Sequence, residues 1–213
     1  MSAYDTSPSV LSVNVAEMRE IERGGRLFRT GIWKLPVAGP VAVRGVNLEG
    51  DDQGDRGVHG GPHKAVYAYA REDIDWWQGE LGRELADGVF GENLTLRGID
   101  PGAALVGERW RIGSALLEVS EPRFPCWKLG SRFDDPLMVK RFARARRTGT
   151  YLRVVEEGTF AAGDGVAVIQ RPDNDLTIAE FARIFLVDRA ELSRLLIEQV
   201  SPEWRDWVRE RVA

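Results

Sequence analysis

The first four fifths of the chain alternate short apolar runs with turns rich in glycine, proline and aspartate. Eight of these runs have the composition of β-strands, because they are rich in Val, Ile, Leu or Tyr and are bounded by turn residues. They are residues 10–15, 41–43, 65–70, 93–96, 109–112, 116–120, 151–155 and 166–169. Many short strands at irregular spacing predict a β-rich α+β fold built on a folded-over sheet or a barrel.

Two segments within this part have helical spacing instead. In residues 71–85, Ile74, Trp77 and Leu81 fall on one face of a helix, which indicates an amphipathic helix packed on the sheet. Residues 136–146 show the same spacing less regularly, with Leu137 and Phe142 as apolar positions. Both segments are therefore predicted to cover the strands.

The pattern changes after residue 172, where strand signals stop and apolar residues recur at helical spacing. Three helix starts carry capping residues, namely Thr177 with Glu180, Asp188 with Glu191, and Ser201 before Pro202. About 40 residues bury little core alone. We therefore divide the chain into a β-domain, 1–172, and a three-helix extension, 173–213, which packs on the strands or on a second copy in a homodimer.

Composition excludes several classes of protein. The chain has 213 residues and a net charge of −4, which disfavours a globally basic nucleic-acid binder. It has no apolar run long enough for a membrane span, and its start lacks the features of a secretory signal. A single cysteine, Cys126, holds neither an iron–sulfur cluster nor a cysteine-rich zinc site. We expect a cytoplasmic protein that contacts neither membrane nor nucleic acid.

The densest group of chemically active residues lies in the glycine-rich segment 50–64. Its five glycines allow the backbone to approach a ligand, and its cationic side chains suit an anion: Arg56, His59, His63 and Lys64. A solvated glycine loop is the plain alternative. A zinc site on His59 and His63 is disfavoured, because Gly60, Gly61 and Pro62 between them prevent a regular helix.

A second group surrounds the cysteine in segment 120–128. Arg123 and Lys128 flank Cys126, and Pro122 and Pro125 stiffen the backbone around it. Nearby cations stabilise a thiolate, which is the form that attacks or binds a metal. A buried, inert cysteine is the alternative, and composition alone leaves the two interpretations even.

Two further segments are weak signals when taken alone. Segment 88–95 offers the amide of Asn93 and the hydroxyl of Thr95 beside glycines, and segment 29–37 places Arg29 and Lys34 beside a glycine and a proline. Each has the composition of an ordinary surface loop.

The order of all these pieces is specific. It runs Lys34-x-Pro36-Val37, Asn47-Leu48-Glu49-Gly50-Asp51, His59-Gly60-Gly61-Pro62-x-Lys64-Ala65-Val66-Tyr67, Gly91-Glu92-Asn93-Leu94 and Pro122-Arg123-x-Pro125-Cys126. Together these motifs resemble the MOSC (molybdenum cofactor sulfurase C-terminal) domain family, in its stand-alone bacterial YiiM-type branch. The resemblance extends over about residues 25–213, and the tail is similar to the three-helix extension of that branch.

The resemblance implies a β-barrel-like fold, a molybdopterin molybdenum cofactor, and reduction of N-hydroxylated compounds such as 6-hydroxylaminopurine to the amine. On that likeness Cys126 is the thiolate ligand of molybdenum, and His59 is the expected proton donor. The residues expected around the anionic cofactor are Lys34, Arg56, Gly60, Gly61, Lys64, Asn93 and Arg123. The sequence departs from the pattern at His63, where similar sequences often have Asp.

The chain has no electron store of its own, so this activity implies an electron-donating flavin or iron–sulfur reductase as partner. A non-enzymatic carrier of the cofactor or of sulfur is the alternative, since it also needs the thiol. A helix-turn-helix interpretation of the tail is disfavoured, because residues 173–213 contain six Arg against nine Asp and Glu.

Overall fold

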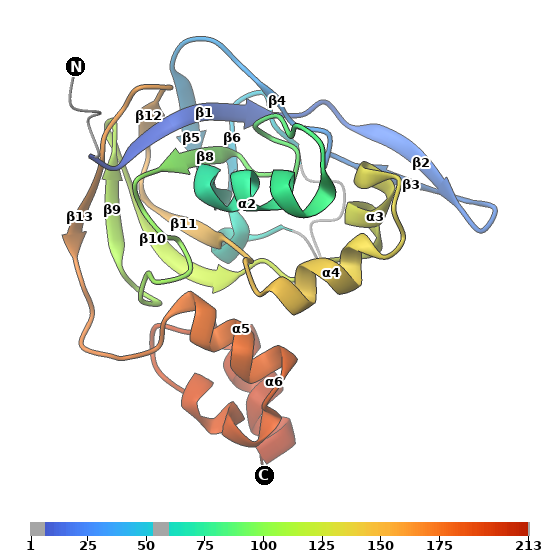
Figure 1. Cartoon of the computed structure of the whole chain (residues 1–213). Helices are drawn as coiled ribbons and strands as arrows, with labels where there is room; N and C mark the ends of the chain where they lie inside the picture. The colour runs from blue at the N-terminus through green and yellow to red at the C-terminus, as the bar shows by residue number, and fades with distance from the viewer. Residues whose placement is uncertain (1–6, 53–59, 213) are drawn as a thin grey trace.

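The computed structural model describes residues 7–52 and 60–212, and its main feature is an eight-stranded, strongly curled sheet (Figure 1). The strands, in the order in which they lie side by side, are β13 (Val166–Gln170), β9 (Arg109–Ile112), β10 (Ala115–Pro122), β11 (Thr150–Glu156), β7 (Val66–Ala70), β8 (Leu94–Arg97), β1 (Ser9–Val15) and β4 (Leu35–Pro36). Among the described strands, only β7 and β8 pair in parallel. The β-rich α+β prediction is confirmed.

The expected closed barrel is not found among the described strands. A single bridge joins Ser9, at the start of β1, to Gly165, just before β13. The last residues of β1 pair instead with β4, Asn14 opposite Pro36 and Val15 opposite Leu35. The sheet therefore curls until its ends meet at one point, but no continuous ladder closes it.

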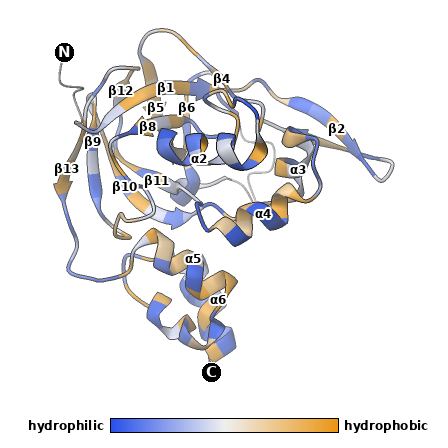
Figure 2. Cartoon of the chain, in the orientation of Figure 1, coloured by the Kyte–Doolittle hydropathy of each residue, from blue (hydrophilic) through white to orange (hydrophobic). Residues whose placement is uncertain are grey.

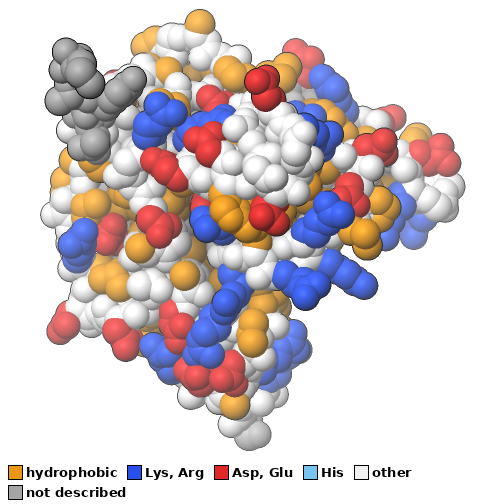
Figure 3. All heavy atoms as spheres, viewed as in Figure 1, with side chains coloured by type: hydrophobic (Ala, Val, Ile, Leu, Met, Phe, Trp, Pro, Cys, Tyr) orange, Lys and Arg blue, Asp and Glu red, His pale blue; other side chains and the backbone are white. Residues whose placement is uncertain are grey.

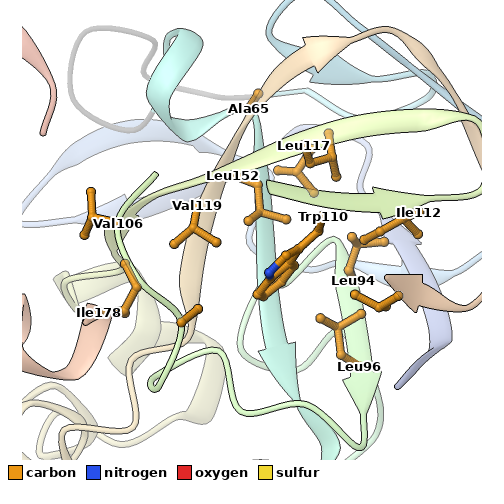
Figure 4. Packing of buried hydrophobic residues seen from close by; sticks show 14 of the residues in the cluster. Ala65, Leu94, Leu96, Val106, Trp110, Ile112, Leu117, Val119, Leu152 and Ile178 are labelled. Atoms are coloured by element: carbon orange, nitrogen blue, oxygen red, sulfur yellow. The ribbon is translucent and has the colours of Figure 1, made fainter. Parts of the chain in front are cut away.

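Alternation along the strands builds the main core. In β9, Trp110 and Ile112 are fully buried, whereas the neighbouring arginines are partly exposed. Figure 4 shows Trp110 among Ile112, Leu94, Leu117 and Leu152, which come from four strands. Burial of such side chains contributes about 1.5–3 kcal/mol each, so this cluster holds the curled sheet together.

A second, aromatic cluster lies between the sheet and the helices α2 (Arg71–Leu81), α3 (Trp127–Phe133) and α4 (Met138–Ala145). Tyr69, Trp77, Phe90 and Phe142 pack there with ring centroids 4.8–6.2 Å apart. α2 was expected to run to residue 85, but it ends at Gly82, which takes a left-handed conformation with φ of 62°.

The tail forms α5 (Ile178–Leu186), a 3₁₀ helix η2 (Arg189–Leu195) and α6 (Pro202–Val212) below the sheet (Figure 1). The Thr177 cap is confirmed, since its hydroxyl accepts from the Glu180 amide at 3.1 Å. Asp188 caps η2 through the Ala190 amide instead. α5 alternates apolar and polar stretches (Figure 2), and its buried residues share one hydrophobic cluster with the strands. The boundary at residue 172 stays a prediction.

Several short elements were not predicted. β2 (Arg19–Arg23) and β3 (Arg26–Thr30) form a hairpin that projects beside α3 (Figure 1), turning at Gly24 and Gly25 with φ of 58° and 74°. β12 (Gly158–Phe160) and β6 (Asn47–Leu48) flank the predicted strand β5 (Val41–Arg44) in a three-stranded sheet. η1 (Pro62–Lys64) precedes β7. Within the described ranges, no helix has both the length and the apolarity needed to cross a bilayer.

Candidate cofactor site

A cavity of about 100 Å³ opens beside Cys126. It brings together five of the residues that were predicted from motifs far apart in the chain, namely Lys34, Lys64, Asn93, Arg123 and Cys126. Arg56 and His59, which were expected at the same site, lie outside the described residues. In the described part of the chain no cluster of three or more His, Cys, Asp or Glu side chains could hold a metal ion on its own.

The half-buried Cys126 lies between the end of β10 and the first residue of α3. Packing on both sides holds this segment. The rings of Trp127 and Phe28, which is in the hairpin, have centroids 5.1 Å apart. The guanidinium carbon of Arg23 lies 4.9 Å from the centroid of the same indole. Phe124 contacts the tail, with Phe185 at 4.5 Å. The hairpin and the tail therefore position the thiol, although both are remote from it in sequence.

Arg123 is a buried cation, and no carboxylate among the described residues forms an ion pair with it. Its side chain is 5% exposed, and its guanidinium carbon lies 5.1 Å from the Phe142 ring and 5.6 Å from the Tyr67 ring. Burial lowers the pKa of Arg123, but the neighbouring Tyr67, Tyr151 and Cys126 raise it by more, so the group stays charged. Its Nη1 is buried and has no hydrogen-bond partner in the described part of the protein. Such an atom favours an anionic ligand in the cavity.

Lys34 and Asn93 converge on Asp51, a residue that the sequence motif contains but that was not expected to take part. Lys34 Nζ donates to Asp51 Oδ2 at 2.5 Å, and Asn93 Nδ2 donates to the same oxygen at 2.9 Å. Burial lowers the pKa of Lys34, and the attraction of Asp51 opposes that effect. The side-chain oxygen of Asn93, Oδ1, accepts a hydrogen bond from the backbone amide of Tyr67 at 3.1 Å. Both side chains therefore take part in building the cavity wall, and their expected role at the cofactor stays a prediction.

A buried carboxyl supports this wall from behind. Glu92 accepts from the amides of Gly88 at 2.6 Å and Phe90 at 2.9 Å and from the Thr95 hydroxyl at 3.0 Å. Burial raises the pKa of Glu92 to about 7 despite these hydrogen bonds. At Gly88, which has φ of 83°, a Cβ atom would come within 2.8 Å of the Lys34 carbonyl oxygen. Glycine therefore permits the close approach of segments 88–92 and 32–34.

Lys64 stands between two cavities, because it also lines a second one of about 420 Å³. Its Nζ lies 3.5 Å from Oε1 of the buried Glu121. Gly60 and Gly61, which were expected at the cofactor, line the second cavity and not the Cys126 cavity. His63 lines it too, with Nδ1 3.2 Å from Ser120 Oγ. Burial is the main cause that lowers the pKa of His63.

Tyr67 and Tyr151 line the Cys126 cavity and were missed as site residues. Burial raises the pKa of Tyr151 to about 12 and that of Tyr67 well above its usual range. Both phenols therefore stay neutral and bring no negative charge to the cavity. Tyr67 lies in the motif that ends His59-Gly60-Gly61-Pro62-x-Lys64-Ala65-Val66-Tyr67, so its position after the conspicuous glycines was the available signal.

Residues 55–167, more than half of the chain, match the MOSC domain. The chain belongs to the MOSC domain family. This MOSC protein is 36% identical to the uncharacterized protein YflK of Bacillus subtilis over 201 residues, which are 92% of this chain and 91% of YflK. It is 32% identical over 204 residues to a Gibberella moniliformis protein named reductase, spanning 92% of this chain but only 36% of the fungal one.

The fold of this MOSC protein is similar to the crystal structure of YiiM from Geobacillus stearothermophilus. The two superpose with a TM-score of 0.80 at 30% sequence identity, covering 97% of this chain and all of that structure. The C-terminal helices are thus part of the shared architecture, and the YiiM-type resemblance of the sequence is confirmed.

Proposed function

We propose that this MOSC protein binds a molybdenum cofactor in the Cys126 cavity and uses it to reduce the N–O bond of N-hydroxylated compounds. The observation that carries the proposal is the meeting of the chain's one thiol with a buried, unneutralised guanidinium in one cavity. The thiol would bind a soft metal centre, and the guanidinium would bind the anionic part of a cofactor.

The residues of the cavity fit such a group. The pterin dithiolene supplies two sulfur donors, so one protein thiolate from Cys126 completes a sulfur-rich set. Arg123 and Lys128, which are 5% and 8% exposed, provide positive charge for the anionic parts of the cofactor. Lys34 is not needed for this role, since Asp51 already neutralises it. Backbone atoms of Gly31 and Gly91 line the remaining wall.

The bound cofactor would supply two-electron chemistry, in which R–NH–OH takes two electrons and two protons and yields R–NH₂ and water. The chain's residues would hold and orient the reactants. Arg123 balances the negative charge of the cofactor, and the protonated phenol of Tyr151 adds a neutral hydroxyl to the cavity. His59 is our expected donor of the proton to the departing hydroxide.

The electrons would come from a flavin or iron–sulfur reductase that docks on the protein. α4 exposes Lys140, Arg144 and Arg146 close to the site, since Phe142 of the same helix contacts Arg123. Figure 3 shows Lys and Arg side chains gathered on this face. A negatively charged electron-transfer protein would be attracted to such a surface. The Gibberella relative named reductase supports the oxidoreductase class.

The proposal is tested by measuring molybdenum in the purified protein and in two substitutions of the thiol. We expect wild type to retain about one molybdenum per chain and Cys126→Ala and Cys126→Ser to lose it, because neither provides a soft sulfur ligand. Ser131→Ala, on the exposed face of α3, serves as the matched control and should retain the metal. Equal molybdenum in wild type and Cys126→Ala would contradict the proposal.

Anaerobic turnover with a reduced dye and 6-hydroxylaminopurine then separates an enzyme from a carrier. We expect the loaded wild type to form adenine, whereas a carrier of the cofactor or of sulfur would form none.

A further inference from the structure

The second cavity has three aromatic walls contributed by the tail, Phe185 of α5 and Trp204 and Trp207 of α6. The ring centroids lie 5.0 Å apart for Phe185 and Trp204, and 5.5 Å for each of the other two pairs. The planes meet at 60° to 81°, so the rings contact one another by their edges and do not stack. Such walls offer aromatic surface to a flat ligand.

These walls do not form a cage for a cation. Rings whose centroids are 5.0–5.5 Å apart are in contact and leave no room for an ammonium group between them. Arg211 already occupies a place 4.0 Å from the Trp207 ring. The aromatic surface therefore suits a neutral ring better than a cation.

Polar groups on the same cavity offer both hydrogen-bond donors and acceptors. His63 and the exposed Glu203 lie on it, and Glu121 is held in place by Lys64 and by the Trp204 indole, which donates to it. A plain hydrocarbon ring would offer no hydrogen bond to the His63 and Glu203 side chains. A nitrogen heterocycle, which carries ring nitrogens and an exocyclic amine, can pair with them.

The cavity also adjoins the candidate cofactor site. Lys64 lines both cavities. Phe124 lines the Cys126 cavity on one side and contacts Phe185 and Trp204 of the aromatic walls at 4.5 and 5.6 Å on the other. A molecule lying against the aromatic walls would therefore extend past Lys64 toward the thiol.

We propose that this second cavity is the subsite for the planar nitrogen-heterocyclic ring of the substrate, whose N-hydroxyl end enters the Cys126 cavity. The inference rests on the proposed function, because that function defines the reacting end. It assigns substrate recognition to the tail and makes Trp207 a specificity-determining residue.

The first experiment measures binding without turnover. Adenine, which is the amine product of a purine N-hydroxyl substrate, is titrated into full-length protein by calorimetry. We expect Trp207→Ala to weaken adenine binding on the order of tenfold, as loss of one stacking surface does. Trp76→Ala is the matched control, since Trp76 is likewise half-buried and lies under an arginine, Arg147, but lines neither cavity. Its affinity should equal that of wild type.

A second variant, Phe185→Leu, retains an apolar side chain but removes the ring, and it serves if circular dichroism shows Trp207→Ala to be unfolded. In dye-driven assays, each variant should raise the KM for 6-hydroxylaminopurine by a larger factor than the KM for N-hydroxyurea, which has no ring. Undetectable adenine binding in wild type, or equal binding in wild type and the folded variants, would overturn the subsite. Adenine binding that depends on Trp207 in a protein without turnover would sustain the subsite and refute the proposed reductase.

Discussion

Replacement of Arg123 by methionine separates the effect on stability from the effect on cofactor binding, because the buried Nη1 of Arg123 has no hydrogen-bond acceptor among the described residues. Methionine has a similar length and fits among the rings of Tyr67 and Phe142, which now contact the guanidinium. The substitution removes a buried charge and the unpartnered Nη1 together.

In the protein without cofactor, the stabilising and destabilising effects of Arg123→Met on the free energy of unfolding nearly cancel. A buried donor without a partner costs about 1–3 kcal/mol, and removing it returns that amount. The two cation–π contacts contribute ~0.5–2 kcal/mol each, and methionine replaces part of this by dispersion and by sulfur–aromatic contacts. The hydrogen bond of Arg123 to Tyr151 is lost as well. We expect the free energy of unfolding to change by less than about 2 kcal/mol, or roughly 4–8 °C in Tm for a chain of this size.

Cofactor binding should respond much more strongly. Removing one member of a buried, hydrogen-bonded charge pair costs about 2–5 kcal/mol, which is on the order of 30-fold or more in Kd. The measurements are molybdenum content after purification and thermal melting of the cofactor-free protein. Arg132→Met is the matched control, since Arg132 also has a buried, unpartnered nitrogen but lines neither cavity. A melting temperature lowered by more than about 10 °C, with wild-type molybdenum in Arg123→Met, would refute the reasoning.

Two further substitutions test the wall of the cavity. Burial raises the pKa of Glu92 from 4.5 to about 7, so the folded state holds this proton more tightly than the unfolded state. This difference stabilises the folded state below pH 4.5, and the stabilisation, on the order of 3 kcal/mol, is lost as the pH rises to about 7. Urea unfolding at pH 4.5 and at pH 7 should show this loss of stability in wild type and not in Glu92→Gln. Lys34→Met leaves Asp51, whose side chain is 1% exposed, without its cation, and should lower the free energy of unfolding by about 3–5 kcal/mol in the same assay. A loss below 1 kcal/mol would show that Asp51 finds another partner.

Much of the fold followed from local patterns. All eight predicted strands are present, with ends that differ by no more than two residues, because each combines β-branched or aromatic residues with turn residues at both ends. The hairpin of β2 and β3 was missed because its strands are mostly charged and exposed. Its Gly24-Gly25 turn was the available signal. A folded-over sheet or barrel was expected from the strand pattern, and a barrel from the family resemblance. Closure depends on how far β1 and β13 overlap, which no local pattern encodes.

The candidate site was predictable in its membership more than in its roles. Motif order brought Lys34, Asn93, Arg123 and Cys126 together correctly. Which of these cations is free for a ligand depends on the carboxylate that lies nearest after folding. Asp51 lies beside Lys34 and not beside Arg123, and only the three-dimensional arrangement reveals this. The contribution of the tail aromatics also required the structure, since they are 59 or more residues from Cys126 in the chain.

The contacts of Asp51 have a consequence for the order of assembly. This carboxylate joins Lys34, 17 residues before it, to Asn93, 42 residues after it, and Asn93 in turn donates to the backbone of Asn14. Contacts at such separations form late in folding, because the chain must first lose the entropy of closing large loops. Metal loading should therefore follow completion of the polypeptide, because a nascent or partly folded chain would not yet have formed the Cys126 cavity that binds the metal.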